Sequence, residues 1–244
     1  MMWKKSATVT VAVLVIALAG LFMACDKQEN PVGNQENLEQ TENGDSSGVA
    51  VDPKENPSVI NSYPPYCFSL NVPFITQVPP GSWSGTKNCG QACGVMLGGY
   101  FNNGAVAPWV ITAENSWLAN YTGNQNYNQP NGWYTSGSNL GAYLAMLHQF
   151  HALNTAVYYG QAPDDVVNEI NNGRPVIVGV MIKNGILVSS GGASHWALAV
   201  GFDGDVYIYL NDPGTSGGNH KRYIMSAFNA SWATQGRIYI PVWK

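Results

Sequence analysis

Two cysteines stand one helical turn apart at the start of a segment rich in small residues. The stretch TKNCGQACGVML, 86–97, contains Cys89 and Cys93. A thiol is a good nucleophile when its thiolate is stabilised, and a helix N-terminus beside an imidazolium provides that stabilisation. We expect a helix over 89–101 that begins at Cys89, with Cys93 one turn inside it. The spacing therefore makes Cys89 the candidate nucleophile.

A later pair of predicted strands brings a histidine to a carboxylate. The segments HWALAVGF and VYIYLND are separated by Asp203 and Gly204, a strong signal for a two-residue hairpin turn. Such a turn pairs His195 with Asp212, and directly opposite residues share a face with Cβ atoms about 4.5–5.5 Å apart. An imidazole and a carboxylate at that separation can hydrogen-bond. A slip of one residue would pair His195 with Asn211 instead, so both partners remain open.

These side chains are of the types that carry out acyl transfer. We expect Cys89 to attack a carbonyl, His195 to act as general acid and base, and Asp212 to fix the tautomer of His195. Gln77 is a candidate side-chain donor to the oxyanion, together with the backbone N–H of Cys89. The alternative for Gln77 is an ordinary glutamine on a surface loop.

A metal site is the main competing interpretation of the two cysteines. Structural zinc prefers four ligands, and the only other cluster in the sequence is HQFH, with His148 and His151. We expect these two histidines to be partly exposed positions on an ordinary amphipathic helix. No metal and no cofactor is therefore predicted.

The first 57 residues differ in character from the rest of the chain. Lys4 and Lys5 precede an uncharged run that ends at Cys25, and residues 1–25 have the layout of an export signal. A cysteine at this position resembles the lipobox of bacterial lipoproteins, and a cleaved signal or an uncleaved anchor is the alternative. Residues 26–57 are polar and carry eight of the 15 acidic residues, which predicts a disordered tether.

Export would place the folded part at the cell envelope, in an oxidising compartment where disulfides persist. If Cys25 carries a lipid anchor to the membrane and Cys89 stays free, Cys67 and Cys93 are left as a disulfide pair. A small core position is the alternative for Cys93.

Residues 58–244 are long enough for one domain with its own core. They contain seven acidic and seven basic residues, so no basic face is indicated and nucleic acid is not an expected partner. Helical patterns come before strand patterns, which favours an α+β fold with a helix packed on an antiparallel sheet. We expect helices at 139–150 and 163–172, an edge strand or arm at 69–77, and strands at 174–182, 195–202, 206–212 and 237–243, with an irregular stretch between 102 and 137.

Small residues recur on two of these predicted elements. Gly90, Gly94, Gly98 and Gly99 cost helical stability, about 1 kcal/mol each relative to alanine. The strand that carries His195 is also small on one face. We therefore expect the glycine-rich helix and this strand to pack closely against each other.

Five segments in order, VPFITQ, NCGQAC, GRPVIVGV, SHWALAVGF and YLNDP, resemble the C39-like branch of the papain-like cysteine peptidases. Members show a VPxxxQ arm, a CGPA helix start, and late HW and DP motifs; proline is usual where this chain has Gln91. The resemblance covers about 71–213 and implies a papain-like fold. It implies that Gln77, Cys89, His195 and Asp212 occupy the oxyanion, nucleophile, base and orienting positions.

The sequence therefore predicts an exported, membrane-anchored cysteine peptidase that hydrolyses peptide bonds through a Cys-His-Asp triad. Its expected substrate is a peptide or protein. Two alternatives remain open. One is a catalytically silent binding module with the same fold, and the other is a cell-wall amidase or transglutaminase-like acyl transferase.

Overall fold

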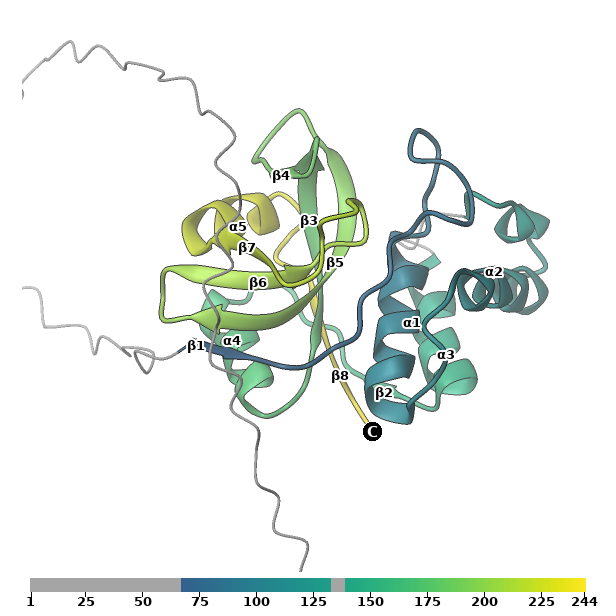
Figure 1. Ribbon diagram of the computed structural model, residues 1–244, viewed down its shortest axis with the longest axis horizontal. Coiled ribbons are helices and arrows are strands. Elements are labelled where there is room, and N and C mark those ends of the chain that lie inside the picture. Colours follow the sequence, from purple (N-terminus) through teal and green to yellow (C-terminus); the bar gives the residue numbers. More distant parts are fainter. Residues whose placement is uncertain (1–66, 133–138) are drawn as a thin grey trace, which may run out of the picture.

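The computed structural model describes residues 67–132 and 139–244, which form a helical half and a half built on a β-sheet (Figure 1). The predicted signal segment 1–25, with Cys25, and the predicted tether 26–57 lie outside the described residues. Within the described ranges, no helix combines the length and the apolar character needed to cross a bilayer.

The helical half contains the nucleophile helix predicted from the sequence. It comprises α1 (Cys89–Asn102), α2 (Pro108–Thr122), the short 3-10 helix η1 (Gln125–Asn128) and α3 (Leu140–His151). The first helix begins at Cys89, as predicted, and ends where the next residue, Asn103, turns left-handed with φ 52°. These helices lie side by side on one side of the molecule in Figure 1.

The helix α2 was not predicted, since the sequence between 102 and 137 reads as irregular. Its boundary signals are nevertheless present: Pro108 stands in the first turn, and Gly123 follows its end with φ 70°. Aromatic and β-branched residues between these boundaries obscure the helical pattern. Helix packing against α1 and α3 outweighs their weak intrinsic propensity.

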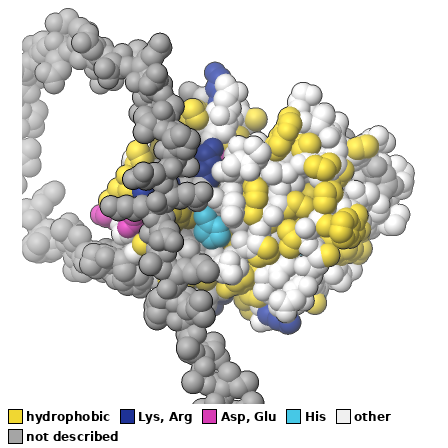
Figure 2. Space-filling model, in the orientation of Figure 1, with side chains coloured by type: hydrophobic (Ala, Val, Ile, Leu, Met, Phe, Trp, Pro, Cys, Tyr) yellow, Lys and Arg dark blue, Asp and Glu magenta, His cyan; other side chains and the backbone are white. Residues whose placement is uncertain are grey.

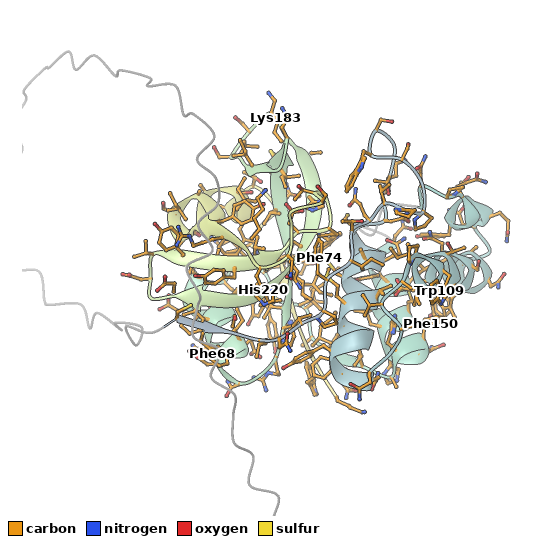
Figure 3. All side chains as sticks on the ribbon, in the orientation of Figure 1. Phe68, Phe74, Trp109, Phe150, Lys183 and His220 are labelled. Carbon is orange, nitrogen blue, oxygen red and sulfur yellow. The ribbon has the colours of Figure 1, made fainter. Side chains whose placement is uncertain are left out.

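Large aromatic side chains remain exposed on this half. Figure 2 shows hydrophobic side chains spread over it, and Figure 3 shows Trp109 of α2 and Phe150 of α3 at its outer side. Trp109 is 67% exposed, and Tyr121 stacks on Trp117 with ring centroids 4.7 Å apart. Trp109 and Tyr121 are therefore outward-facing rings of α2, whereas Tyr127 of η1 is buried.

The other half is an antiparallel sheet in which the predicted strand at 174–182 is central. Its strands follow the order β2-β8-β3-β5-β6-β7, with β1 paired to β5 and β4 paired to β3. The strands are β1 (Cys67–Ser69), β2 (Asn154–Thr155), β3 (Val176–Lys183), β4 (Ile186–Leu187), β5 (Ala193–Asp203), β6 (Tyr207–Asn211), β7 (Lys221–Ile224) and β8 (Tyr239–Trp243).

Two further helices pack on the sheet. The predicted helix α4 (Pro163–Asn171) begins at its proline, and the Asp165 carboxylate accepts a hydrogen bond from the Ala162 N–H at 2.9 Å. The helix α5 (Met225–Ala233) was not predicted. Trp232 and Phe228 anchor α5 in the core with no exposed surface.

The helical and sheet halves share one hydrophobic core. Met96 and Leu97 of α1 belong to the same buried cluster as Val178 of β3 and Ala197 of β5. Burial of such side chains contributes about 1.5–3 kcal/mol each, so the contact between the two halves is a major source of stability. The start of α1 is thereby held against β5.

Candidate active site

The Cys89 thiol is buried at the first residue of α1 and contacts the sheet half. Its sulfur is hydrogen-bonded to the His195 ring and to the backbone N–H groups of Trp196 and Gly90. Burial alone would raise the pKa of the thiol, but the hydrogen bond and charge of His195, with these two N–H groups, lower it below its usual value. The thiolate is therefore stabilised relative to that of a free cysteine.

The His195 ring links the thiol to a carboxylate. Its Nε2 atom lies 2.8 Å from Oδ1 of Asp212, which leaves Nδ1 for the Cys89 thiol. Burial alone would lower the pKa of His195, but the hydrogen bonds and charges of Asp212 and Cys89 raise it to about 10. The imidazolium form is therefore favoured beside the thiolate.

Three donors surround the Asp212 carboxylate, whose side chain is 1% exposed. Oδ1 accepts hydrogen bonds from His195 and from the Gly214 N–H at 2.9 Å, and Oδ2 accepts one from the Tyr223 hydroxyl at 2.8 Å. Burial alone would raise the pKa of Asp212, but these donors and the His195 charge lower it. The carboxylate therefore stays ionised. Sequence reasoning missed Tyr223, because β7 was not predicted.

The hairpin that carries His195 and Asp212 differs from its predicted register. Residues 204–206 separate β5 from β6, and a β-bulge shifts the pairing within β5. Leu198 consequently pairs with Asn211. The predicted two-residue turn would have paired it with Tyr209, two positions earlier. Direct pairing of His195 with Asp212 is therefore wrong. A displacement of two residues keeps the same face, so the two side chains still meet diagonally.

Asn211 does not replace Asp212 as the partner of His195. Its Nδ2 donates to the Val72 carbonyl at 3.2 Å, and its Oδ1 accepts from the His220 N–H at 2.9 Å. The His220 ring in turn lies 3.0 Å from the Leu70 carbonyl. Asn211 thus fastens the 70–77 arm to the sheet.

The structure brings Gln77 between the loops that carry the other candidates. Its backbone N–H donates to the carbonyl of Pro213 at 2.9 Å, and its own carbonyl accepts from the Thr86 hydroxyl at 3.4 Å. Its Oε1 atom is buried without a hydrogen-bond partner among the described residues. A buried polar side chain without a partner is costly in a merely structural position.

The predicted Cys67–Cys93 disulfide is wrong, because Cys93 is a free thiol. Cys67 pairs with Asp203 at the hairpin end of β5, whereas Cys93 lies one turn inside α1 and is completely buried. Cys93 therefore takes the alternative role of a small core residue, and burial raises its pKa.

A second histidine–carboxylate pair lies on another face of α1. His151 Nε2 is 2.7 Å from Oε1 of Glu114, and both side chains are buried. The expectation that His151 would be partly exposed is wrong, while His148 is exposed. Among the described residues, no group of three or more His, Cys, Asp or Glu is arranged to hold a metal ion.

Two glycines of α1, Gly94 and Gly98, face this second pair. A Cβ atom added at Gly98 would lie 2.5 Å from His151 Nδ1, and one added at Gly94 would lie 2.9 Å from Glu114 Oε1. The expected role of these glycines in letting the His195 strand approach is therefore wrong. They let α2 and α3 approach, and no sequence motif links residues so far apart.

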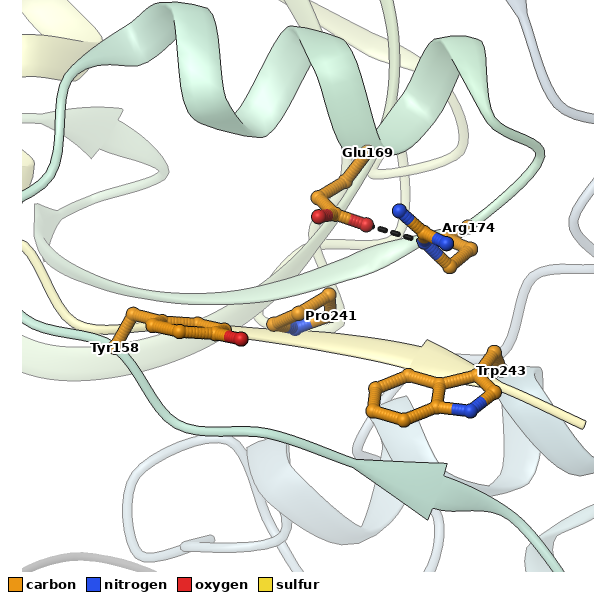
Figure 4. Close-up of a pocket in the computed structure, with 5 residues that line it drawn as sticks. All are labelled: Tyr158, Glu169, Arg174, Pro241 and Trp243. Atoms are coloured by element: carbon orange, nitrogen blue, oxygen red, sulfur yellow. Dashed lines mark hydrogen bonds and ion pairs between the residues drawn. The ribbon is translucent and has the colours of Figure 1, made fainter.

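A small surface pocket lies away from these residues, between α4 and β8 (Figure 4). It has a volume of about 160 Å³ and contains the Glu169–Arg174 ion pair. It is lined by Tyr158, Glu169, Arg174, Pro241 and Trp243. The pocket shares no lining residue with the Cys89 site.

The α+β fold and the buried thiol–imidazole pair define a cysteine peptidase-type domain of papain-like fold. Residues 69–240 match the family described as Peptidase_C39 like family. The match spans most of the chain, and the protein belongs to this family.

Solved structures with similar folds include two from this class. One is a Bacillus anthracis protein described as a C39-like peptidase, with TM-score 0.47 and 18% identity, covering 72% of this chain and 97% of that one. The other is the peptidase domain of Streptococcus ComA, described as a bifunctional ABC transporter involved in a quorum-sensing pathway. Its TM-score is 0.45 with 14% identity, and the match covers 71% of this chain and 96% of that domain. A search of curated proteins gives no match.

Proposed function

We propose that this protein is an active cysteine peptidase that hydrolyses amide bonds of peptides or proteins. The observation that carries the proposal is the chain of contacts from the Cys89 thiol through His195 to Asp212. A carboxylate–imidazole–thiol chain at a helix N-terminus is the arrangement that activates a cysteine nucleophile.

The residues divide the reaction between them. The Cys89 thiolate forms a bond to the carbonyl carbon, and the carbonyl oxygen takes the negative charge. The backbone N–H of Cys89 and the side-chain amide of Gln77 donate to that oxygen. The His195 imidazolium gives its proton to the leaving amine, and the amine departs from the acyl-enzyme. His195 then takes a proton from water as the water oxygen bonds to the acyl carbon, and the C–S bond breaks to release the acid product and restore the Cys89 thiolate beside the His195 imidazolium.

Asp212 has a positioning role in this scheme. Its carboxylate accepts from Nε2 of His195, which keeps Nδ1 directed at Cys89 in both protonation states. The carboxylate also stabilises the imidazolium that pairs with the thiolate. Substitution of Asp212 should therefore lower kcat and leave KM nearly unchanged.

We also propose that the domain acts outside the cytoplasm, anchored to the membrane through a lipid on Cys25. The charged and then apolar pattern of residues 1–25 supports this proposal. These residues, Cys25 included, lie outside the described part of the chain. Growth of expressing cells with a tagged fatty acid should label the protein, and Cys25→Ser should abolish the label. An unlabelled wild-type protein in the membrane fraction would contradict lipidation.

The peptidase proposal is tested by the reactivity of Cys89. Iodoacetamide labelling is followed by peptide-level mass spectrometry from about pH 4 to pH 10, because a free thiol with a pKa of about 8.5 is mostly protonated at pH 6. The wild-type Cys89 should react rapidly at about pH 6, and His195→Ala should lose this reactivity. Cys93→Ala is the matched control, because it removes a buried thiol from the same helix and should leave Cys89 reactive.

A peptide library then tests hydrolysis itself, with peptidoglycan fragments as a parallel substrate. Cleavage of peptides by the wild-type protein, and none by Cys89→Ala, is the expected result. Cys89 that reacts no faster than glutathione in both wild type and His195→Ala would contradict an activated nucleophile. A reactive Cys89 that cleaves only peptidoglycan fragments would contradict the peptidase assignment.

A further inference from the structure

Tyr223 lies beneath the Asp212 carboxylate, on the side away from His195. It is a residue of β7, which pairs with β6, and its side chain is largely buried. Its hydroxyl oxygen is 2.8 Å from Oδ2 of Asp212, the oxygen that His195 does not contact. The two carboxylate oxygens therefore have different partners.

The Tyr223 hydroxyl has one proton and two neighbouring acceptors. The carbonyl of Gly185 lies 3.2 Å away, and the Asp212 oxygen lies 2.8 Å away. The Gly185 carbonyl also accepts from the Lys221 ammonium at 2.5 Å. A hydrogen bond to an ionised acceptor is the stronger one, and the Asp212 oxygen is also the nearer acceptor, so the Tyr223 proton goes to Asp212.

We propose that Tyr223 is a positioning residue that holds Asp212 in the orientation that His195 requires. This inference rests on the proposed function of the Cys89 site. Tyr223 donates to Oδ2, while His195 and the Gly214 N–H occupy Oδ1, so the carboxylate cannot rotate without losing a donor. The hydroxyl thus acts through Asp212 on the imidazole.

Removal of the hydroxyl has a definite chemical consequence. With phenylalanine at this position, Oδ2 of Asp212 remains buried and loses its donor, since the Asp212 side chain is 1% exposed. A carboxylate in that state either rotates or binds a proton more readily. Both responses loosen the His195 ring and make the thiolate–imidazolium pair less stable at low pH.

The test compares Tyr223→Phe with Tyr209→Phe. Tyr209 lies on the neighbouring strand β6, and its hydroxyl contacts Cys67 Sγ at 3.7 Å. For each protein, the iodoacetamide rate constant of Cys89 is measured across the same pH range as before, and kcat and KM are measured with the best peptide. Thermal unfolding gives the stability of each variant.

Tyr223→Phe should lower the Cys89 rate constant at about pH 6 by about tenfold and move the acidic limb of the profile to higher pH. It should lower kcat with little change in KM, while Tyr209→Phe matches the wild type. A profile for Tyr223→Phe that overlays the wild type, with or without a lower Tm, would overturn the role of Tyr223 and leave the peptidase proposal intact. An unreactive Cys89 in the wild type would overturn both.

Discussion

Two buried histidine–carboxylate pairs contact α1, and they have nearly the same geometry but opposite electrostatics. The His195–Asp212 distance is 2.8 Å and the His151–Glu114 distance is 2.7 Å, and no side chain in either pair is more than 8% exposed. The pKa of Asp212 is lowered, whereas that of Glu114 is raised to about 7.

The difference comes from the donors around each carboxylate. Asp212 accepts from His195, Tyr223 and the Gly214 N–H. Burial raises the pKa of Glu114, and the hydrogen bond and charge of His151 offset this only in part. The Oε2 atom of Glu114 has no hydrogen-bond partner among the described residues. A histidine alone therefore does not fix the charge of a buried carboxylate. The first pair is organised to keep a charge, and the second is organised to hold three helices together.

Removal of the histidine from each pair should give the largest contrast. His195→Ala removes the proposed general acid and base and should lower kcat/KM for peptide hydrolysis by at least about 10³-fold. His151→Ala should keep kcat/KM within a few-fold and lower the free energy of unfolding by about 3 kcal/mol, because a buried pair is broken. Peptide assays and urea denaturation measure the two effects. Equal losses of activity in both variants would contradict the division of roles.

Two glutamines, Gln77 and Gln91, have buried Oε1 atoms without a hydrogen-bond partner among the described residues, and they extend the comparison. Gln77→Ala should reduce kcat by about 10²-fold, because an oxyanion donor is lost. Gln91→Ala should reduce stability by about 1–3 kcal/mol, because the hydrogen bond from its Nε2 to Asn115 at 2.8 Å is lost. Steady-state kinetics and thermal unfolding separate these outcomes. A Gln77→Ala variant with unchanged kcat would remove Gln77 from the oxyanion site.

The raised pKa of Glu114 predicts a pH dependence of stability. The folded state holds the Glu114 proton up to about pH 7, whereas the unfolded chain releases it near 4.5. The stabilisation is therefore fully present below 4.5 and is lost as the pH rises through 7, by about 3 kcal/mol. Urea denaturation at several pH values across this window gives the free energy of unfolding of the wild type and of Glu114→Gln. The wild-type value should fall with rising pH relative to that of Glu114→Gln, which has no carboxyl proton to lose at this position. Parallel curves would contradict the raised pKa.

A glycine substitution should give the smallest effect. Gly98→Ala places a Cβ atom 2.5 Å from His151 Nδ1 and should destabilise the protein by about 1–3 kcal/mol. Gly141→Ala on α3 is the matched control, because its added Cβ meets no atom of another packed segment within 4 Å in the part of the chain that the structure describes. It should stabilise the protein by up to about 1 kcal/mol. Thermal unfolding measures both, and a neutral Gly98→Ala would mean that α3 can shift without cost.

The sequence predicted the parts of the site that local patterns encode. Cys89 at a helix start and His195 near Asp212 each follow from a short segment, and a two-residue register error left the face unchanged. The Glu114–His151 contact could not be predicted, because it joins two helices by packing alone and α2 itself has weak helical signals. Tyr223 could not be predicted either, because β7 has only four residues and is too short to show a strand pattern in the sequence.

The position of β8 has a consequence for when the site can form during synthesis. This strand is made last among the described residues, yet it lies inside the sheet, between β2 and β3. Until residues 239–243 leave the ribosome, one edge of β3 has no partner, and β3 is the strand that supports β5 and His195. We therefore expect a chain that stops short of β8 to hold His195 poorly and to carry Cys89 as an ordinary thiol. Rapid reaction of Cys89 with iodoacetamide at about pH 6 should then require residues 239–243.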